Sequence, residues 1–198
     1  MADSEVSHAY GALASDIVAV LGTDIGHADP DRTIIDSWAA SVAGSILDVG
    51  SGTGRWSGHL ARLGFDVQGL EPVPELLNIA RVAHPSVPFR QQAIADLADG
   101  DEQWSGILAW YSLIHMTPYE LAAALEVLNQ ALAPGGTLLM SYFSGETLEV
   151  FQHRVALAYQ WPTHAMAGVG TAAGFKIVTQ YADPRRPHAI TLAQKPVT

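Results

Sequence analysis

Cysteine is absent from this 198-residue chain. Disulfides, thiolate metal sites and cysteine nucleophiles are therefore excluded. Basic residues are also scarce, 10 against 20 acidic residues, and the formal net charge is −10. The few lysines and arginines form no basic stripe, which argues against a nucleic-acid partner, because neutralising phosphates supplies much of the affinity for nucleic acids.

Long apolar runs are also lacking, and no segment approaches the length of a membrane span, so we expect no membrane partner. The acidic residues 1–5 lack signal-peptide character and predict a cytoplasmic location. Eight histidines are present, but none has the spacing of a zinc site, so we expect no metal. With 48% hydrophobic and 15% charged residues, the chain is expected to fold as one globular domain, 1–198.

The most informative segment begins with a short apolar stretch, 46–49, that reads as a strand. Three glycines then stand at every second position, before the start of a helix: Gly50, Gly52 and Gly54. A second apolar strand, 67–70, leads directly to Glu71. A glycine turn lets a ligand approach bare backbone amides, and an acid at the end of the next strand can accept both hydroxyls of a ribose. The pattern predicts a nucleoside site at the carboxyl edge of a parallel sheet.

The glycine spacing indicates which nucleoside is bound. Dinucleotide folds usually carry G-x-G-x-x-G, whereas this chain has G-x-G-x-G with Arg55 where the longer pattern would continue. Asp48 would sit close to a pyrophosphate, where two negative charges repel, but it suits a ligand with a cationic ammonium group. The pattern resembles motif I of the class I S-adenosylmethionine-dependent methyltransferases. The cofactor of that family carries an ammonium, a carboxylate, a sulfonium and an adenosine.

Strands and helices are expected to alternate along the chain, which is typical of an α/β, doubly wound sheet. The segment 145–161 is expected to be poor in helix. The expected helices cover 8–21, a stretch from 29, 55–63, a stretch from 74, a stretch from 117 and 163–173. The expected strands are 46–49, 67–70, 87–91, 107–110, 137–142, 176–181 and 189–194.

The family resemblance covers about residues 45–194. Three further segments are similar to the family's fourth-strand motif, its turn into strand five and its entry to a late strand: 109–116, 132–139 and 173–178. The resemblance implies a Rossmann-like, seven-stranded, mostly parallel sheet whose last strand is antiparallel. It also implies that residues 1–44 form a helical lid over the cofactor, on a core of residues 45–198.

The same resemblance implies a set of cofactor-binding residues. Asp48 would hold the amino group of the cofactor, with a helix or turn cap as the alternative. Arg55 would pair with the carboxylate, unless it is solvated. Glu71 would hold the ribose. The whole set is Asp48, Gly50, Ser51, Gly52, Gly54, Arg55, Trp56, Glu71, Pro72, Ala93, Ile94 and Ala109.

One position departs from the family pattern. After strand three the family usually has an acid that accepts from the adenine amino group, but here the aligned residues are Gln92, Ala93 and Ile94. Backbone groups of Ala93 or Ile94 are candidates for this role, and so is the side chain of Asp96, which lies slightly later.

Four residues are candidates for catalysis. His115 follows the fourth strand, where a substrate would lie, and is either a general base or a structural hydrogen-bonding group. Tyr111 and His188 are likewise each either a general base or a structural hydrogen-bonding group. Tyr10 lies in the expected lid, where it either covers the sulfonium or packs in a helix core. We also expect an acceptor site near Arg185, Arg186 and His188, or else under the lid around Tyr10 and Trp38; the two arginines are alternatively a solvated turn.

The sequence thus predicts a methyltransferase that uses S-adenosylmethionine, releases S-adenosylhomocysteine and acts on a small molecule. Because the positive sulfonium already activates the methyl group, the protein mainly aligns the acceptor and excludes water, so no catalytic triad is needed. A non-catalytic protein that binds the cofactor is the alternative. A nicotinamide oxidoreductase is disfavoured by the glycine spacing and Asp48. The methyl acceptor and the oligomeric state stay open.

Overall fold

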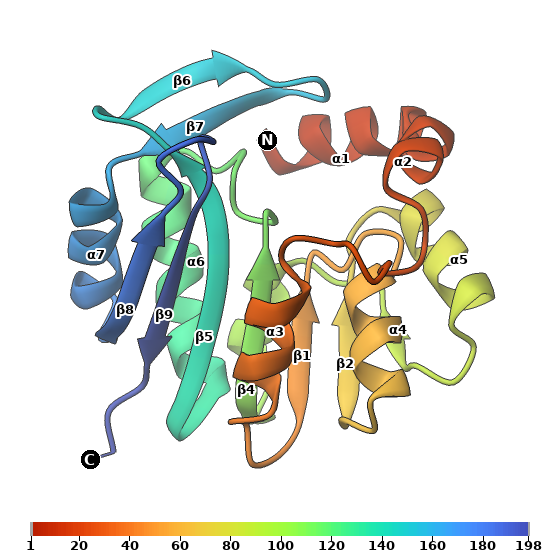
Figure 1. The fold of residues 1–198 in the computed structure, drawn as a ribbon, viewed down its shortest axis with the longest axis horizontal. Helices are drawn as coiled ribbons and strands as arrows, with labels where there is room; N and C mark the ends of the chain where they lie inside the picture. Colours follow the sequence, from red (N-terminus) through yellow and green to blue (C-terminus); the bar gives the residue numbers. More distant parts are fainter. Residues whose placement is uncertain (1, 198) are drawn as a thin grey trace.

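The computed structural model describes residues 2–197. Helices and strands alternate along most of this length (Figure 1). The helices are α1 (Ala2–Ala12), α2 (Ala14–Leu21), α3 (Arg32–Ala39), α4 (Arg55–Arg62), α5 (Pro74–Ala83), the 3-10 helix η1 (Ile94–Asp99), α6 (Pro118–Ala131) and α7 (Thr163–Ala172). The strands are β1 (Ile46–Val49), β2 (Val67–Leu70), β3 (Phe89–Arg90), β4 (Trp104–Trp110), β5 (Leu132–Ser144), β6 (Glu149–Gln152), β7 (Leu157–Trp161), β8 (Lys176–Ala182) and β9 (Ala189–Gln194). Across the described residues, none of the helices has both the length and the apolar character that crossing a membrane requires.

The main sheet has seven strands in the order β3-β2-β1-β4-β5-β9-β8. All neighbours from β3 to β5 are parallel. The last strand of the chain, β9, runs antiparallel to both β5 and β8. The predicted doubly wound fold with an antiparallel last strand is therefore confirmed. Because β1 to β4 are parallel, the residues that follow them meet at one edge of the sheet.

Alternation along the strands divides the core between the two faces of the sheet. One face packs on α6 and α7 and is centred on Leu47, Ile107, Leu125, Leu128 and Leu138. The other face packs on α3 and α4 and is centred on Ile46, Leu108, Leu139, Trp38 and Leu60. Successive side chains of each strand therefore point to opposite faces of the sheet. Near the end of a strand, this alternation determines which side chain can reach a site at the sheet edge.

Helices α1 and α2 lie across the carboxyl edge of the sheet (Figure 1). The single helix predicted over 8–21 is wrong, because the chain bends at Leu13, where ψ is 9°. The bend allows Ala14 to pack with Val73 and Leu76 at the start of α5. Helix α3 instead packs on a face of the sheet through Trp38, so only part of segment 1–44 lies over the edge.

Strands β6 and β7 form an antiparallel hairpin that the sequence did not predict. The hairpin extends the far end of β5, because β7 pairs in parallel with residues Phe143 and Ser144. It stands at the same edge of the molecule as α1 and α2 (Figure 1). Its turn therefore joins the two helices as a second covering element of that edge.

Candidate active site

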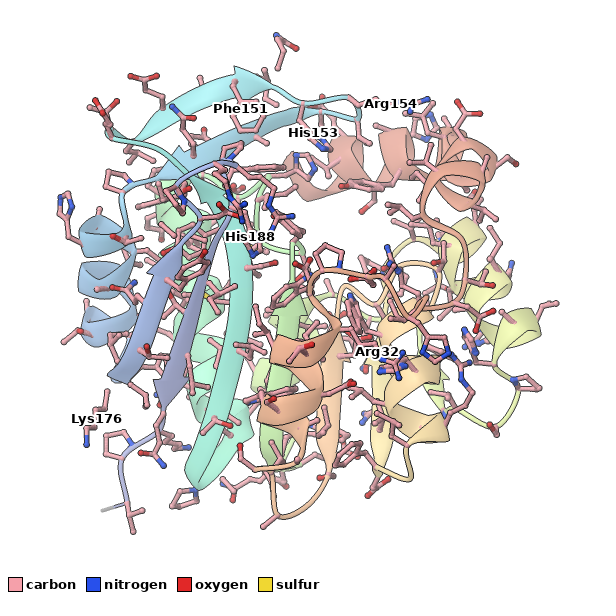
Figure 2. The ribbon with its side chains drawn as sticks, viewed as in Figure 1. Arg32, Phe151, His153, Arg154, Lys176 and His188 are labelled. Carbon is pink, nitrogen blue, oxygen red and sulfur yellow. The ribbon has the colours of Figure 1, made fainter. Side chains whose placement is uncertain are left out.

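A cavity of about 760 Å³ lies at the carboxyl edge of the sheet. Its floor is made by the residues that follow β1, β2, β3 and β4, and its roof by α1, α2 and the hairpin turn at His153, Arg154 and Val155. Figure 2 shows His153 and Arg154 above the start of β9, where His188 lies. The guanidinium of Arg154 approaches the Asp16 carboxylate on α2 to 3.8 Å, so the two parts of the roof meet.

The three glycines of the turn after β1 all adopt positive φ, but they serve different purposes. A Cβ at Gly50 would lie 2.4 Å from the Cβ of Ser112, whereas one at Gly52 would meet nothing within 4 Å. Both line the cavity, as does Ser51, whose buried hydroxyl has no partner. Gly54 does not line the cavity, so its predicted contact with the cofactor stays a prediction. Its missing side chain makes room for Ala80 and Phe89, since a Cβ at Gly54 would lie 2.9 Å from each of their side chains.

Glu71 lies at the end of β2 and is 4% exposed. Its carboxylate accepts the Gly52 N–H at 2.7 Å and the Val73 N–H at 2.9 Å. Burial raises the pKa of Glu71, and these two hydrogen bonds oppose the rise. A carboxylate has more than two lone pairs, so Glu71 can still accept hydrogen bonds from a ligand. Pro72, next in the chain, also lines the cavity.

Asp48 lies at the end region of β1, 2% exposed, and accepts a hydrogen bond from the Ser57 hydroxyl at 2.6 Å. Burial raises the pKa of Asp48 to about 7, and the nearby charge of Glu71 adds to the rise. Near neutral pH the buried carboxyl is therefore poised to ionise when a cation arrives. This is the property that an ammonium-binding acid needs.

Arg55 and Trp56 open α4 and both line the cavity. The Arg55 guanidinium pairs with the Asp29 carboxylate at 2.5 Å, although its buried Nε has no partner. Arg55 is thus tied to the loop before α3, and its predicted pairing with a cofactor carboxylate stays a prediction. The ring of Trp56 stands edge-on to that of Trp110, with centroids 6.2 Å apart.

The loop after β3 contributes Gln92, Ala93 and Ile94 to the lining. The Asp96 carboxylate accepts the Ala93 N–H at 2.8 Å and does not line the cavity. Gln92 does line it, and its buried Oε1 has no partner. The sequence identified this position but not the side chain, since only the fold shows that the amide oxygen is buried and unpaired.

Ala109 was predicted to contact the cofactor, but the structure does not bring it to the cavity. It is fully buried in the core on the α6 side of β4. Alternation along the strand is the reason, because Trp110, one residue later, faces the other way and does line the cavity.

The far end of the cavity is aromatic and carries two histidines. The His115 Nδ1 donates to the Leu157 carbonyl at 2.7 Å, which leaves Nε2 to accept the Tyr10 hydroxyl at 2.9 Å. Burial lowers the pKa of His115 and raises that of Tyr10 to about 12. His153 of the hairpin packs its ring 5.2 Å from that of His115, beside Phe143. The hairpin residues were missed because nothing in their local sequence indicates that the turn folds over the sheet edge.

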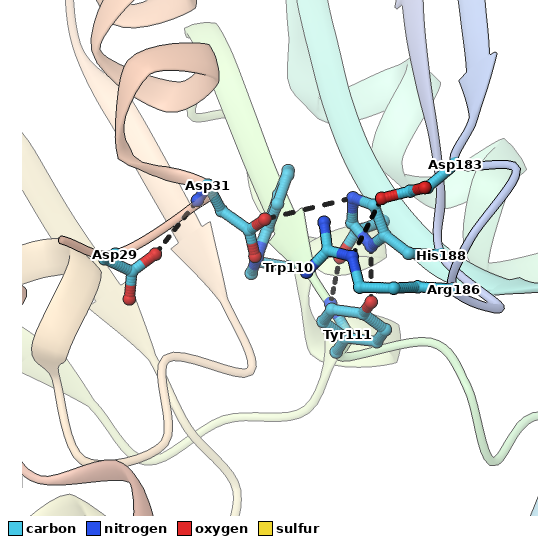
Figure 3. Close-up of polar contacts among 8 residues, drawn as sticks. Asp29, Asp31, Trp110, Tyr111, Asp183, Arg186 and His188 are labelled. Carbon is cyan, nitrogen blue, oxygen red and sulfur yellow. Dashed lines mark hydrogen bonds and ion pairs between the residues drawn. The ribbon is translucent and has the colours of Figure 1, made fainter.

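Tyr111 also lines this end, and its hydroxyl is hydrogen-bonded to the His188 Nδ1 (Figure 3). His188 is 3% exposed and does not line the cavity, so it would reach a ligand only through Tyr111. Neither Arg185 nor Arg186 lines the cavity. Their Nε atoms lie 3.8 Å and 2.8 Å, respectively, from the carboxylate oxygens of Asp183. The structure therefore does not bring these arginines to the cavity, and an acceptor site beside them stays a prediction. Trp38 is likewise packed on the sheet rather than in the cavity.

Comparisons with known proteins agree with this geometry. A family model described as a methyltransferase domain matches residues 14–180. A ubiquinone biosynthesis O-methyltransferase of Xylella fastidiosa (strain M23) is 34% identical over 128 residues, which are 62% of this chain and 51% of the relative. The Burkholderia thailandensis 1,6-didemethyltoxoflavin-N1-methyltransferase, solved with 1,6-didemethyltoxoflavin and S-adenosylhomocysteine, has a TM-score of 0.73 at 24% identity and covers 96% of this chain and 90% of its own. The [4+2]-cyclase SpnF has a TM-score of 0.82 at 18% identity and covers 98% and 96%.

The family match spans most of the chain, so the chain belongs to the methyltransferase-domain family, the class I S-adenosylmethionine-dependent methyltransferases. These are transferases whose cofactor is S-adenosylmethionine. The chain spans about half the length of the curated relatives it matches. The likeness to these two solved structures, both below 25% identity, shows the fold alone.

Proposed function

We propose that this chain transfers the methyl group of S-adenosylmethionine to a small-molecule acceptor. The observation that carries the proposal is that one cavity joins two chemically different ends. Glu71 and the glycine turn form the nucleoside end, and Tyr111 and His115 belong to the aromatic end. Transfer between two bound molecules requires that they meet in one space from which water is excluded.

The residues at the nucleoside end fit this cofactor. The open space beside Gly52 gives a ligand room to lie against the turn, and the unpaired Ser51 hydroxyl is available there to hydrogen-bond it. Asp48 would hold the ammonium group, because a buried carboxyl with a raised pKa gains most from a cation. Glu71 would accept the ribose hydroxyls, and the unpaired Gln92 Oε1 would accept the adenine amino group. Asp48, Glu71 and Gln92 would each accept a hydrogen bond from a donor of the cofactor, and buried polar groups require such partners.

The bound cofactor supplies a methyl group already activated by the positive charge on sulfur. The remaining work falls to the residues of the roof and of the aromatic end. Tyr10 of α1 hydrogen-bonds His115 across the cavity, which holds the roof closed. The aromatic rings of Tyr111 and Phe143 would orient a flat acceptor. A cavity of about 760 Å³ that must hold both molecules favours a small acceptor, and the net charge of −10 disfavours a nucleic acid.

Two measurements test the proposal. Calorimetry should show S-adenosylmethionine and S-adenosylhomocysteine binding one site per chain, with NAD and NADP silent. A panel of small hydroxyl and N–H compounds, incubated with the protein and S-adenosylmethionine, should yield S-adenosylhomocysteine in an acceptor-dependent manner. Binding without any product would instead favour a non-catalytic cofactor-binding protein. Tight NAD binding with no response to either adenosyl compound would refute the proposal.

A further inference from the structure

Three polar side chains from distant parts of the chain contact one another in a row, Tyr111, His188 and Asp31 (Figure 3). Tyr111 follows β4 and lines the cavity. Its hydroxyl is hydrogen-bonded to Nδ1 of His188, which precedes β9. The His188 Nε2 faces Oδ1 of Asp31, which precedes α3, at 4.0 Å. Tyr111 and Asp31 both line the cavity, and the buried imidazole of His188 lies between the phenol and the carboxylate.

The carboxylate fixes how the imidazole is protonated. The neutral ring of His188 carries one proton, and a proton on Nε2 faces Asp31, whereas a bare Nε2 would set a lone pair against a negative oxygen. The Nε2–H form is therefore favoured, which leaves Nδ1 bare. A bare Nδ1 accepts the hydroxyl proton of Tyr111, so the oxygen lone pairs of Tyr111 stay available to a ligand.

Both atoms that face each other across 4.0 Å are buried and have no other partner. The other oxygen of Asp31 accepts the Trp110 indole N–H at 3.1 Å, so the carboxylate is held from one side. A small movement would pair Oδ1 with His188 and satisfy two buried groups together, which is the arrangement that burial favours. The contact between Asp31 Oδ1 and His188 Nε2 is thus expected to shorten when the imidazole of His188 becomes positively charged.

The backbone at Tyr111 adds an independent observation. Its φ is 55°, in the left-handed region that a bulky residue rarely adopts. The Tyr111 N–H donates to the Ser141 hydroxyl at 2.9 Å, which holds this conformation. Strained conformations of this kind cluster at functional sites. A glycine or asparagine would fit the backbone better, so the tyrosine side chain is what the position requires.

We propose that Tyr111, supported by His188 and Asp31, removes the proton from the methyl acceptor; this rests on the proposed function. The acceptor X–H bond breaks as its proton moves to the Tyr111 oxygen, and the Tyr111 proton moves to His188 Nδ1. The acceptor atom forms a bond to the methyl carbon, and the carbon–sulfur bond breaks with its electron pair left on sulfur. Asp31 stabilises the resulting imidazolium. The acceptor is therefore a compound whose nucleophile carries a proton, a hydroxyl or an N–H group.

The charges around the pair agree with this assignment. Burial raises the pKa of Tyr111 to about 12, so the phenol is neutral at the start. Burial lowers the pKa of His188, so the ring is neutral and can accept a proton. Asp31 and Asp183 favour the charged ring, and Arg186 opposes it. Asp31 therefore makes it easier for the buried ring of His188 to take the proton.

Nitrogen NMR of the histidine rings tests the proposal without any acceptor, so it can fail independently of methyl transfer. The His188 signals are assigned by their loss in His188→Gln. At neutral pH the proton should reside on Nε2, and Asp31→Asn, which can keep the Trp110 hydrogen bond, should lower the pKa of His188. A proton on Nδ1, or a His188 pKa unchanged in Asp31→Asn, overturns the proposal.

Kinetics with S-adenosylmethionine and the acceptor found in the panel give the second readout. Tyr111→Phe keeps the ring and should lower kcat by about a hundredfold or more, with cofactor affinity kept, as loss of a general base does. His188→Gln should lower kcat similarly, and Asp31→Asn should shift the acid limb of the kcat–pH profile to lower pH, because the pKa of His188 falls. Tyr142→Phe is the matched control, because it removes a buried hydroxyl outside the cavity and should leave kcat unchanged. A Tyr111→Phe variant with normal kcat overturns the proposal.

Discussion

Replacing Asp48 with asparagine is expected to stabilise the protein and to weaken cofactor binding at the same time. The wild-type carboxyl is buried, and its pKa is raised to about 7, mainly by burial. An unfolded aspartate has a pKa of about 3.9. Folding therefore disfavours the ionised form, and asparagine removes that penalty while its amide oxygen can still accept the Ser57 hydroxyl.

The size and the pH window of the effect follow from the same shift. At about 1.4 kcal/mol for each pKa unit, the penalty amounts to about 4 kcal/mol above about pH 7. Below about pH 4 both states are protonated and the penalty vanishes. The free energy of unfolding of the wild type should thus fall as the pH rises from about 4 to about 7, relative to Asp48→Asn. Loss of a charge-assisted hydrogen bond to the ammonium should weaken binding by about tenfold to a hundredfold.

Urea unfolding of the ligand-free protein across this pH range measures the first effect, and calorimetry with S-adenosylmethionine measures the second. Asp24→Asn is the control, because its carboxylate is 68% exposed in a surface ion pair and should change the free energy of unfolding by less than about 1 kcal/mol. The reasoning is refuted if Asp48→Asn and the wild type have parallel pH profiles. The ammonium assignment is refuted if the variant binds the cofactor normally.

Further changes separate binding from folding. Glu71→Ala should weaken cofactor binding by about tenfold to several hundredfold. The apo Tm should also fall, because the Gly52 N–H loses its acceptor. Gly54→Ala should cost about 1–3 kcal/mol of stability or more through strain and close contacts, measured by urea unfolding. Gly52→Ala strains a positive φ as well, but its side chain would enter open space, so it should cost less stability than Gly54→Ala and weaken cofactor binding more; equal effects of the two glycine variants on affinity would contradict this. Tyr10→Phe should lower the hydrogen-exchange protection of α1, because its hydrogen bond to His115 is lost, and unchanged protection would exclude that link.

Much of the fold could be predicted from the sequence because its signals are local. The glycine turn, the capping box at Thr117 and the apolar strands each depend on a few neighbouring residues, and the structure contains all of them. The hairpin of β6 and β7 could not be predicted in the same way. Its first strand is largely exposed, so it lacks the apolar alternation that marks a half-buried strand.

Of the site residues, those marked by local sequence could also be predicted, whereas those brought together only by the fold could not. Asp48 lies near the end of a strand that the sequence identifies, and Glu71 follows another, so their meeting at one edge was predictable. Ala109 was assigned to the cavity although strand alternation turns it into the core. Asp31 could not be found from sequence, because its approach to His188 joins residues from the two ends of the chain. Only the complete sheet brings them together.

The tryptophans that line the cavity provide an intrinsic fluorescence signal for events in the site. Of five tryptophans, Trp56 and Trp110 line the cavity, while the others are buried away from it. An adenine ring or a flat acceptor entering the cavity would therefore change the emission of these two indoles. Because the Trp110 N–H is bonded to Asp31, its emission should also respond to charge on the neighbouring imidazole. Fluorescence can thus follow occupancy and proton movement in the unlabelled protein.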